Sequence, residues 1–111
     1  MLNLPPILGS WFGIDRVAAF AERVAGRSRL AAWQRVQEQV YLLQPAEARG
    51  YVRARAISVV KDETQRLIEQ EGEGARRRQT QIEEAAVQML VEMISTQTAQ
   101  ARASRVVRRA A

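Results

Sequence analysis

The chain of 111 residues contains no cysteine and no histidine. Their absence excludes the Ser-His-Asp triad, Cys-His nucleophiles, zinc sites built on these residues and haem ligation by either side chain. The sequence also lacks a Walker-type phosphate loop and a Gly-x-Gly-x-x-Gly fingerprint, two common nucleotide-binding motifs. The sequence does not exclude a site formed by carboxylates that come together only in the folded chain. We expect no enzymatic activity, no metal and no cofactor.

Aromatic residues are scarce, with two each of tryptophan, tyrosine and phenylalanine, whereas eighteen residues are alanine. Alanine favours helix, but it removes little apolar area from water, and burial contributes only about 25 cal/mol per Å². The six aromatic residues and the three prolines all lie at or before Tyr51. The sequence therefore predicts a thin core of the kind that a partner chain often completes.

Lysine is nearly absent too, because the net charge of +5 arises from sixteen arginines and the single Lys61 against twelve acidic residues. Arginine favours planar, bidentate contacts with carboxylates and phosphates, although a GC-rich genome would produce the same bias. The basic excess suits nucleic acid, an anionic membrane surface and an acidic protein face equally well.

No stretch of eighteen residues in the sequence is both apolar and without a charged side chain. Nothing in the sequence therefore predicts a membrane span. The uncharged stretch Met1–Ile14 also lacks the basic region with which a signal peptide begins. We expect a cytoplasmic protein.

The first half of the chain is divided by helix breakers. Two adjacent prolines predict an irregular apolar segment over residues 1–14. Asp15 is a suitable N-cap for a short helix over residues 16–25, which Gly26 would end. Ser28 is a suitable N-cap for the next helix, over residues 29–43.

The second half reads as two longer helices. Pro45 suits the first turn of a helix over residues 46–71, and Gly72-Glu73-Gly74 is the clearest break in the chain. Beyond it, residues 75–111 contain no glycine, proline or aromatic residue and predict one long helix. The fold class expected is all-α, a small helical bundle or helical hairpin of about four helices. Residues 15–71 would form a compact cap and residues 75–111 a long C-terminal helix.

The last helix carries a thread of residues spaced alternately four and three apart. Only its first part is strongly apolar, where Leu90 and Ile94 widen the stripe. A sustained coiled coil needs three or four good heptads, so an antiparallel hairpin with the preceding helix is favoured over a long parallel dimer. The thread consists of Ile82, Ala86, Met89, Met93, Thr96, Gln100, Ala103 and Val107.

Two arginine clusters are candidate sites for an anion or an acidic partner. Arg76, Arg77 and Arg78 follow the glycine break, where cations would oppose the dipole of a helix beginning at residue 75. Either an anionic neighbour or a helix start at Thr80 would resolve that conflict. The other cluster is Arg102, Arg105, Arg108 and Arg109. These four arginines would bind a row of phosphates or an acidic partner protein, or they would simply complement the dipole of the helix.

The N-terminal segment is the candidate protein-binding site, with Leu8, Trp11, Phe12 and Ile14 as its partner-binding residues. It carries a large apolar load without a charged side chain. The segment would fold back over the bundle, insert into a groove of another protein, or lie in a membrane interface through residues 1–27.

Three functions follow from these features. The leading hypothesis is a non-enzymatic structural or adaptor subunit that binds other protein chains in a larger assembly, as a homo- or hetero-oligomer. The alternatives are nucleic-acid binding without sequence specificity, through the arginine clusters, and peripheral attachment to a membrane.

Overall fold

The computed structural model describes the backbone of residues 5–110 and the side chains of residues 16–105. Within these limits the chain forms helices and no strand, which confirms the all-α prediction. Four α-helices and one 3-10 turn follow one another in the order α1 (Pro5–Val36), η1 (Val40–Leu42), α2 (Pro45–Glu71), α3 (Glu73–Arg77) and α4 (Gln79–Ala110).

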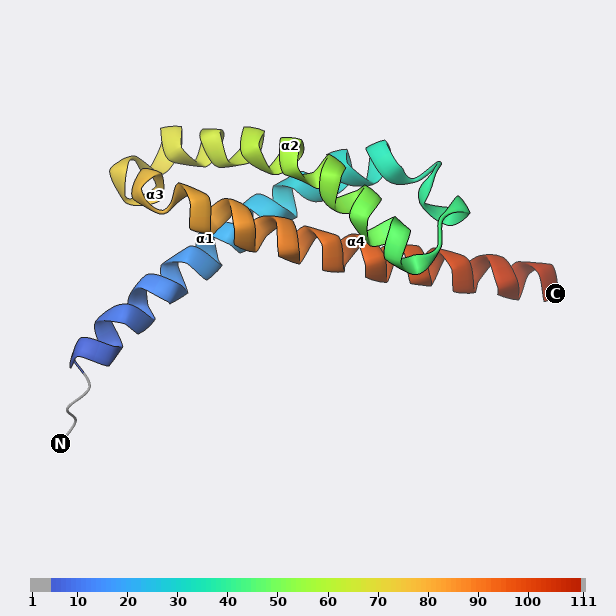
Figure 1. Ribbon diagram of the computed structural model, residues 1–111, viewed down its shortest axis with the longest axis horizontal. Coiled ribbons are helices and arrows are strands. Elements are labelled where there is room, and N and C mark those ends of the chain that lie inside the picture. The colour runs from blue at the N-terminus through green and yellow to red at the C-terminus, as the bar shows by residue number, and fades with distance from the viewer. Residues whose placement is uncertain (1–4, 111) are drawn as a thin grey trace.

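The three long helices form a bundle. Helix α2 turns back through the short α3 into α4, and these two helices run antiparallel as a hairpin (Figure 1). Helix α1 crosses against both of them, so that every pair of long helices is in contact. The hairpin favoured by the sequence is therefore the arrangement found, with α1 as its third member.

Small side chains line the core. On α1 the buried series has helical spacing of three and four, and most of its members are alanine or valine. Small residues let helix backbones approach closely, so a core with few large side chains still excludes water. The larger fully buried residues come from α2 and α4. They are Leu67, Ile82, Leu90 and Ile94.

Helix α1 is continuous where the sequence predicts two helices. Gly26 does not end it, and Ser28 is not an N-cap: its buried hydroxyl donates a hydrogen bond to the Val24 carbonyl oxygen at 2.7 Å. Alanines on both sides of Gly26 favour helix, and packing against α2 and α4 outweighs the cost of one glycine. In this part of α1, Leu30 is 66% exposed, whereas Ala32 is buried.

The start of α1 also differs from the sequence prediction. The irregular segment expected over residues 1–14 is helical from Pro5 onward. Pro5 and Pro6 occupy the first turn, where backbone N–H groups have no partner inside the helix, so the prolines remove no hydrogen bond.

The turn between α2 and α4 is centred on Gly72. Its φ of 82° lies in the left-handed region that glycine adopts without strain, and its N–H donates to the Ile68 carbonyl oxygen at 2.8 Å. Helix α2 begins at Pro45 as predicted, and Glu47 accepts a hydrogen bond from the Gln44 N–H at 3.3 Å. The last long helix begins at Gln79 rather than at residue 75.

The buried side of α4 is broader than the thread predicted from sequence. Leu90 and Ile94 are fully buried, whereas Met89 and Met93 are half-buried and Thr96 is exposed. Because α4 packs on two helices at once, its buried residues occupy a wide stripe rather than a narrow coiled-coil seam.

We expect Gly26→Ala to raise the free energy of unfolding by about 0.5 to 1 kcal/mol, because alanine is the better helix former. A Cβ at this position meets no heavy atom within 4 Å. Urea denaturation followed by circular dichroism measures the change.

Gly72→Ala is the matched control. We expect it to lower the free energy of unfolding by about 1 kcal/mol or more, because the backbone at residue 72 has a positive φ that alanine adopts only with strain. A loss of stability in Gly26→Ala as well would contradict a continuous α1 and indicate a break at that residue.

Candidate interaction surfaces

The N-terminal part of α1 extends beyond the bundle. In Figure 1 it passes the end formed by α3 and continues away from α2 and α4. Arg16 is exposed, Val17 and Phe20 are half-buried, and Ala21 is the first fully buried residue on this helix. Val17 and Phe20 already pack against the core, so among the described side chains packing begins at about Val17 and becomes complete at Ala21.

The predicted partner-binding residues belong to this extension. Leu8, Trp11, Phe12 and Ile14 lie in the part of α1 whose backbone is described, but their side chains fall outside the described residues. The backbone carries them away from the bundle, so the alternative in which this segment folds back over the core is not the arrangement found.

The core is closed without the extension. The buried cluster runs from Ala21 on α1 to Ile94 on α4 and draws on all the helices between them. Among the described side chains, every buried nitrogen and oxygen has a hydrogen-bond partner. Thr64 and Thr98, for example, donate to carbonyl oxygens one turn earlier in their own helices. The buried core is thus formed by residues that lie after the extension in the chain.

Arg76, Arg77 and Arg78 lie at the end of α3, outside α4. Arg76 and Arg77 are exposed in the last turn of α3, and Arg78 donates to the Gly74 carbonyl oxygen at 3.0 Å. Because α4 begins at Gln79, Arg76 and Arg77 lie outside it, whereas the Arg78 carbonyl oxygen accepts the first hydrogen bond of α4, from the Ile82 N–H at 2.8 Å. None of the ion pairs found within residues 16–105 includes these three arginines.

The C-terminal cluster is partly engaged within the chain. The Arg102 guanidinium donates to the Val40 carbonyl oxygen at 3.3 Å, and the Arg105 guanidinium lies 4.1 Å from the centroid of the Tyr41 ring. Tyr41 in turn packs edge-on against Trp33, with ring centroids 6.3 Å apart. These contacts tie α4 to η1 and α1. The side chains of Arg108 and Arg109 lie outside the described residues.

The two arginine clusters occupy opposite ends of the bundle. Arg78 precedes α4 and Arg102 lies near its far end, which places them about 36 Å apart along the helix axis. The nucleic-acid hypothesis, which needs both clusters on one surface, would therefore require a surface that spans this distance.

Charge is distributed unequally between these ends. We define the α3 half as residues 16–28 and 59–87, and the η1 half as residues 29–58 and 88–105. The α3 half has eight basic and eight acidic residues, whereas the η1 half has seven basic and three acidic. The net positive charge of the described region therefore belongs to the η1 half.

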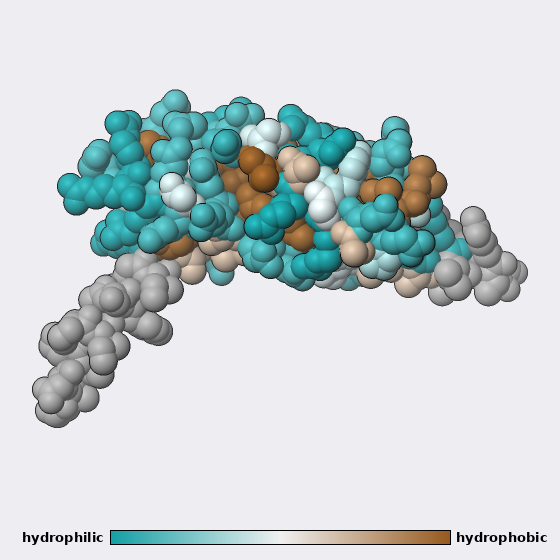
Figure 2. All heavy atoms as spheres, in the orientation of Figure 1, coloured by the Kyte–Doolittle hydropathy of each residue, from teal (hydrophilic) through white to brown (hydrophobic). Residues whose placement is uncertain are grey.

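A pocket of about 220 Å³ opens in the η1 half, between η1, the start of α2 and the later turns of α4. Leu42 is 76% exposed in the adjoining η1. Figure 2 shows a largely hydrophilic face with hydrophobic patches near the middle of the bundle and at the η1 end.

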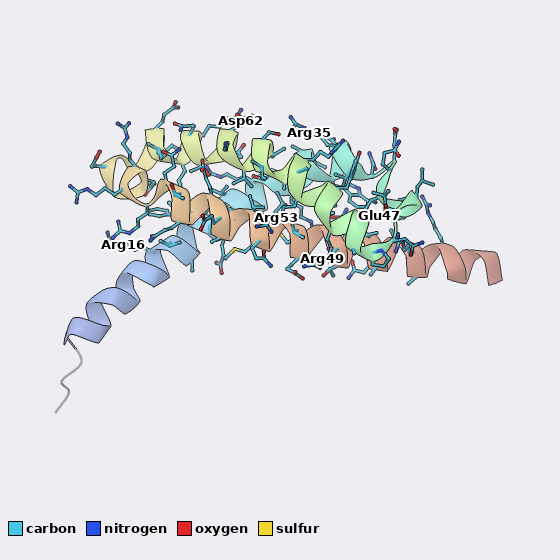
Figure 3. All side chains as sticks on the ribbon, in the orientation of Figure 1. Arg16, Arg35, Glu47, Arg49, Arg53 and Asp62 are labelled. Carbon is cyan, nitrogen blue, oxygen red and sulfur yellow. The ribbon has the colours of Figure 1, made fainter. Side chains whose placement is uncertain are left out.

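Arginines of α2 also align with polar residues of α4. Arg49 forms an ion pair with Glu92, and Arg53 donates to the Gln88 side-chain oxygen at 3.2 Å. Figure 3 shows both arginines on the side of α2 that faces α4. These contacts agree with the antiparallel register of the hairpin.

No group of three or more acidic, histidine or cysteine residues is placed to hold a metal ion in the region described. None of the described helices combines the length and apolar character needed to cross a membrane.

Comparison with known proteins gives no match for this chain among family models, curated proteins or solved structures.

We expect Arg105→Gln to lower the free energy of unfolding by about 0.5 to 1 kcal/mol, because the cation leaves the Tyr41 ring. Urea denaturation measures the difference. Arg77→Gln is the matched control and should change stability by less than about 0.5 kcal/mol, as an exposed substitution without a partner contact does. Equal effects of the two variants would argue against a role for the Tyr41 contact.

Proposed function

We propose that this protein is a non-enzymatic α-helical structural or adaptor subunit, and that it binds another protein chain through the N-terminal part of α1. One observation carries the proposal. Helix α1 leaves the bundle with an uncharged, apolar segment, although the bundle has already closed its own core.

The composition of the extension supports enclosure by a partner. Residues 1–14 contain no charged side chain, and only Asn3 and Ser10 are polar. A helix that is apolar on all sides is normally buried on all sides. Complete burial of four large side chains would contribute on the order of 6 to 12 kcal/mol before the costs of association. The four are Leu8, Trp11, Phe12 and Ile14.

The apolar spacing of the extension continues that of the rest of α1, which supports binding of the extension to its partner as a helix. Positions 7, 11 and 14 continue the series of three and four residues formed by Val17, Ala21 and Val24. The same helical face that packs on α2 and α4 inside the bundle thus extends past them. A groove between helices of another protein is the partner surface that suits it.

Membrane attachment is less well supported than a protein partner. As a helix, residues 5–14 measure about 15 Å, half the hydrocarbon thickness of a bilayer. An interfacial helix needs a polar face, which these residues lack. The adjacent α3 half also has equal numbers of basic and acidic residues, so it offers no net attraction to anionic lipid.

Site-specific photo-crosslinking in the source cells tests the proposal. A photoreactive residue replaces Trp11 in one variant and exposed Gln65 of α2 in a matched control. We expect a discrete protein adduct from position 11 and none from position 65, because only the extension is enclosed by the partner.

Other outcomes of this experiment would count against a protein partner. Adducts formed only with lipid would favour membrane attachment, and the absence of any adduct specific to position 11 would contradict the proposed interface.

A further inference from the structure

The pocket in the η1 half has apolar walls. Five of its lining residues are apolar and come from three elements, and they are Val40, Pro45, Ala48, Val52 and Ala99. Ser95 and Thr98 also line the pocket, and the Thr98 hydroxyl already donates to the Ile94 carbonyl oxygen at 2.8 Å. A cavity of about 150 Å³ holds benzene in another protein, so this pocket is large enough for one leucine or phenylalanine side chain.

Two arginines border the same pocket. Arg49 approaches from α2 and Arg102 from α4, and Arg105 lies one turn further along α4 over the Tyr41 ring. Arg49 is paired with Glu92, whereas Arg102 is held by a backbone carbonyl. Of the two guanidinium groups that border the apolar cavity, that of Arg102 has a neutral partner, and so does the nearby guanidinium of Arg105.

Neutral partners are the rule for cations of the η1 half. Six of its seven basic side chains contact an amide or hydroxyl oxygen, a backbone carbonyl or a tyrosine ring, and these contacts leave their charge uncompensated. The pairs are Arg29 with Gln97, Arg35 with Ser58, Arg53 with Gln88, Arg55 with Tyr51, Arg102 with Val40 and Arg105 with Tyr41.

The three acidic residues of the η1 half neutralise little of the positive charge of these arginines. Glu92 is used by Arg49, and Glu47 accepts a hydrogen bond from the backbone at the start of α2. Only Glu38 remains of the three. Guanidinium groups that are positioned in advance lose less entropy when they bind an anion.

From this arrangement we propose that the η1 pocket binds an acidic peptide segment of a partner protein. One bulky apolar side chain of that segment enters the pocket, and flanking carboxylates contact Arg102 and Arg105. The site is distinct from the N-terminal extension of α1 and lies at the opposite end of the bundle, so the inference stands independently of that interface.

A peptide suits this surface better than nucleic acid. A sugar–phosphate backbone would use the charges but leave the apolar pocket and exposed Leu42 uncovered. Single-stranded nucleic acid would need exposed aromatic rings for stacking, whereas Tyr41 and Tyr51 are half-buried and already contact arginines.

Fluorescence anisotropy with synthetic probes tests the proposal on the full chain. The probe is a labelled peptide with a central leucine flanked by glutamates, and its matched controls replace the leucine by serine or the glutamates by glutamine. We expect saturable binding of the probe at physiological salt, and binding weaker by about tenfold or more for each control.

Three variants of the chain locate the site. Ala99→Leu fills the pocket without changing charge and should abolish peptide binding. Arg102→Gln should weaken it about tenfold, as expected for the loss of one charge-assisted contact. Arg77→Gln in the α3 half is the matched control and should leave binding unchanged. Circular dichroism verifies that each variant is folded.

Several results would overturn the inference. These are an absence of saturable peptide binding, peptide binding that Ala99→Leu does not affect, and binding of duplex or single-stranded DNA in preference to the peptide. A Trp11→Ser variant should bind the peptide as the unaltered chain does, which separates this site from the proposed N-terminal interface.

Discussion

Helix α1 packs on the α2–α4 hairpin through small side chains, and the rest of the molecule depends on that contact. Ala21, Ala25, Ser28 and Ala32 are buried along one side of α1. Their size lets three helices approach closely enough to exclude water with few large side chains between them. Because the helix is continuous through this contact, the direction in which it crosses the hairpin also fixes the direction of its N-terminal part.

The bundle consequently has two dissimilar ends. At the α3 end, equal numbers of acidic and basic residues surround the place where an uncharged apolar helix emerges. At the η1 end, Arg49 and Arg102 border a largely apolar pocket, and Arg105 lies one turn further along α4 over the Tyr41 ring. The two proposed interfaces therefore differ in chemistry: the proposed contact at the α3 end rests on apolar burial, and the proposed contact at the η1 end rests on charge together with a single apolar anchor.

Much of the fold was predictable from the sequence. Pro45 and Gly72 mark the ends of α2 because each imposes its backbone geometry locally, and the apolar residues of α4 have helical spacing that tertiary packing preserves. Gly26 and Ser28 misled the prediction, because both are strong local signals that packing overrides. The Ser28 hydroxyl is satisfied by the carbonyl oxygen of Val24 in its own helix, so a buried serine in the middle of a helix leaves no polar group unpaired.

The sites were less predictable than the helices. The apolar load of residues 1–14 is evident from composition alone, and so is the basic C-terminal cluster. The pairing of Arg105 with Tyr41, and the pocket beside Arg102, require contacts between elements far apart in the chain, which no local pattern encodes. The unequal charge of the two halves likewise emerges only when the register of the three helices is known.

The most direct test of this account is the solvent exposure of Trp11 in the isolated chain. In a Trp33→Phe variant, Trp11 is the only tryptophan, and its emission and quenching by acrylamide can be followed at concentrations where light scattering shows a monomer. The account predicts emission at long wavelength and efficient quenching, since the backbone of the extension of α1 runs away from the bundle. A protected, blue-shifted Trp11 in the monomer would show that the segment folds back onto its own bundle, and would contradict the account.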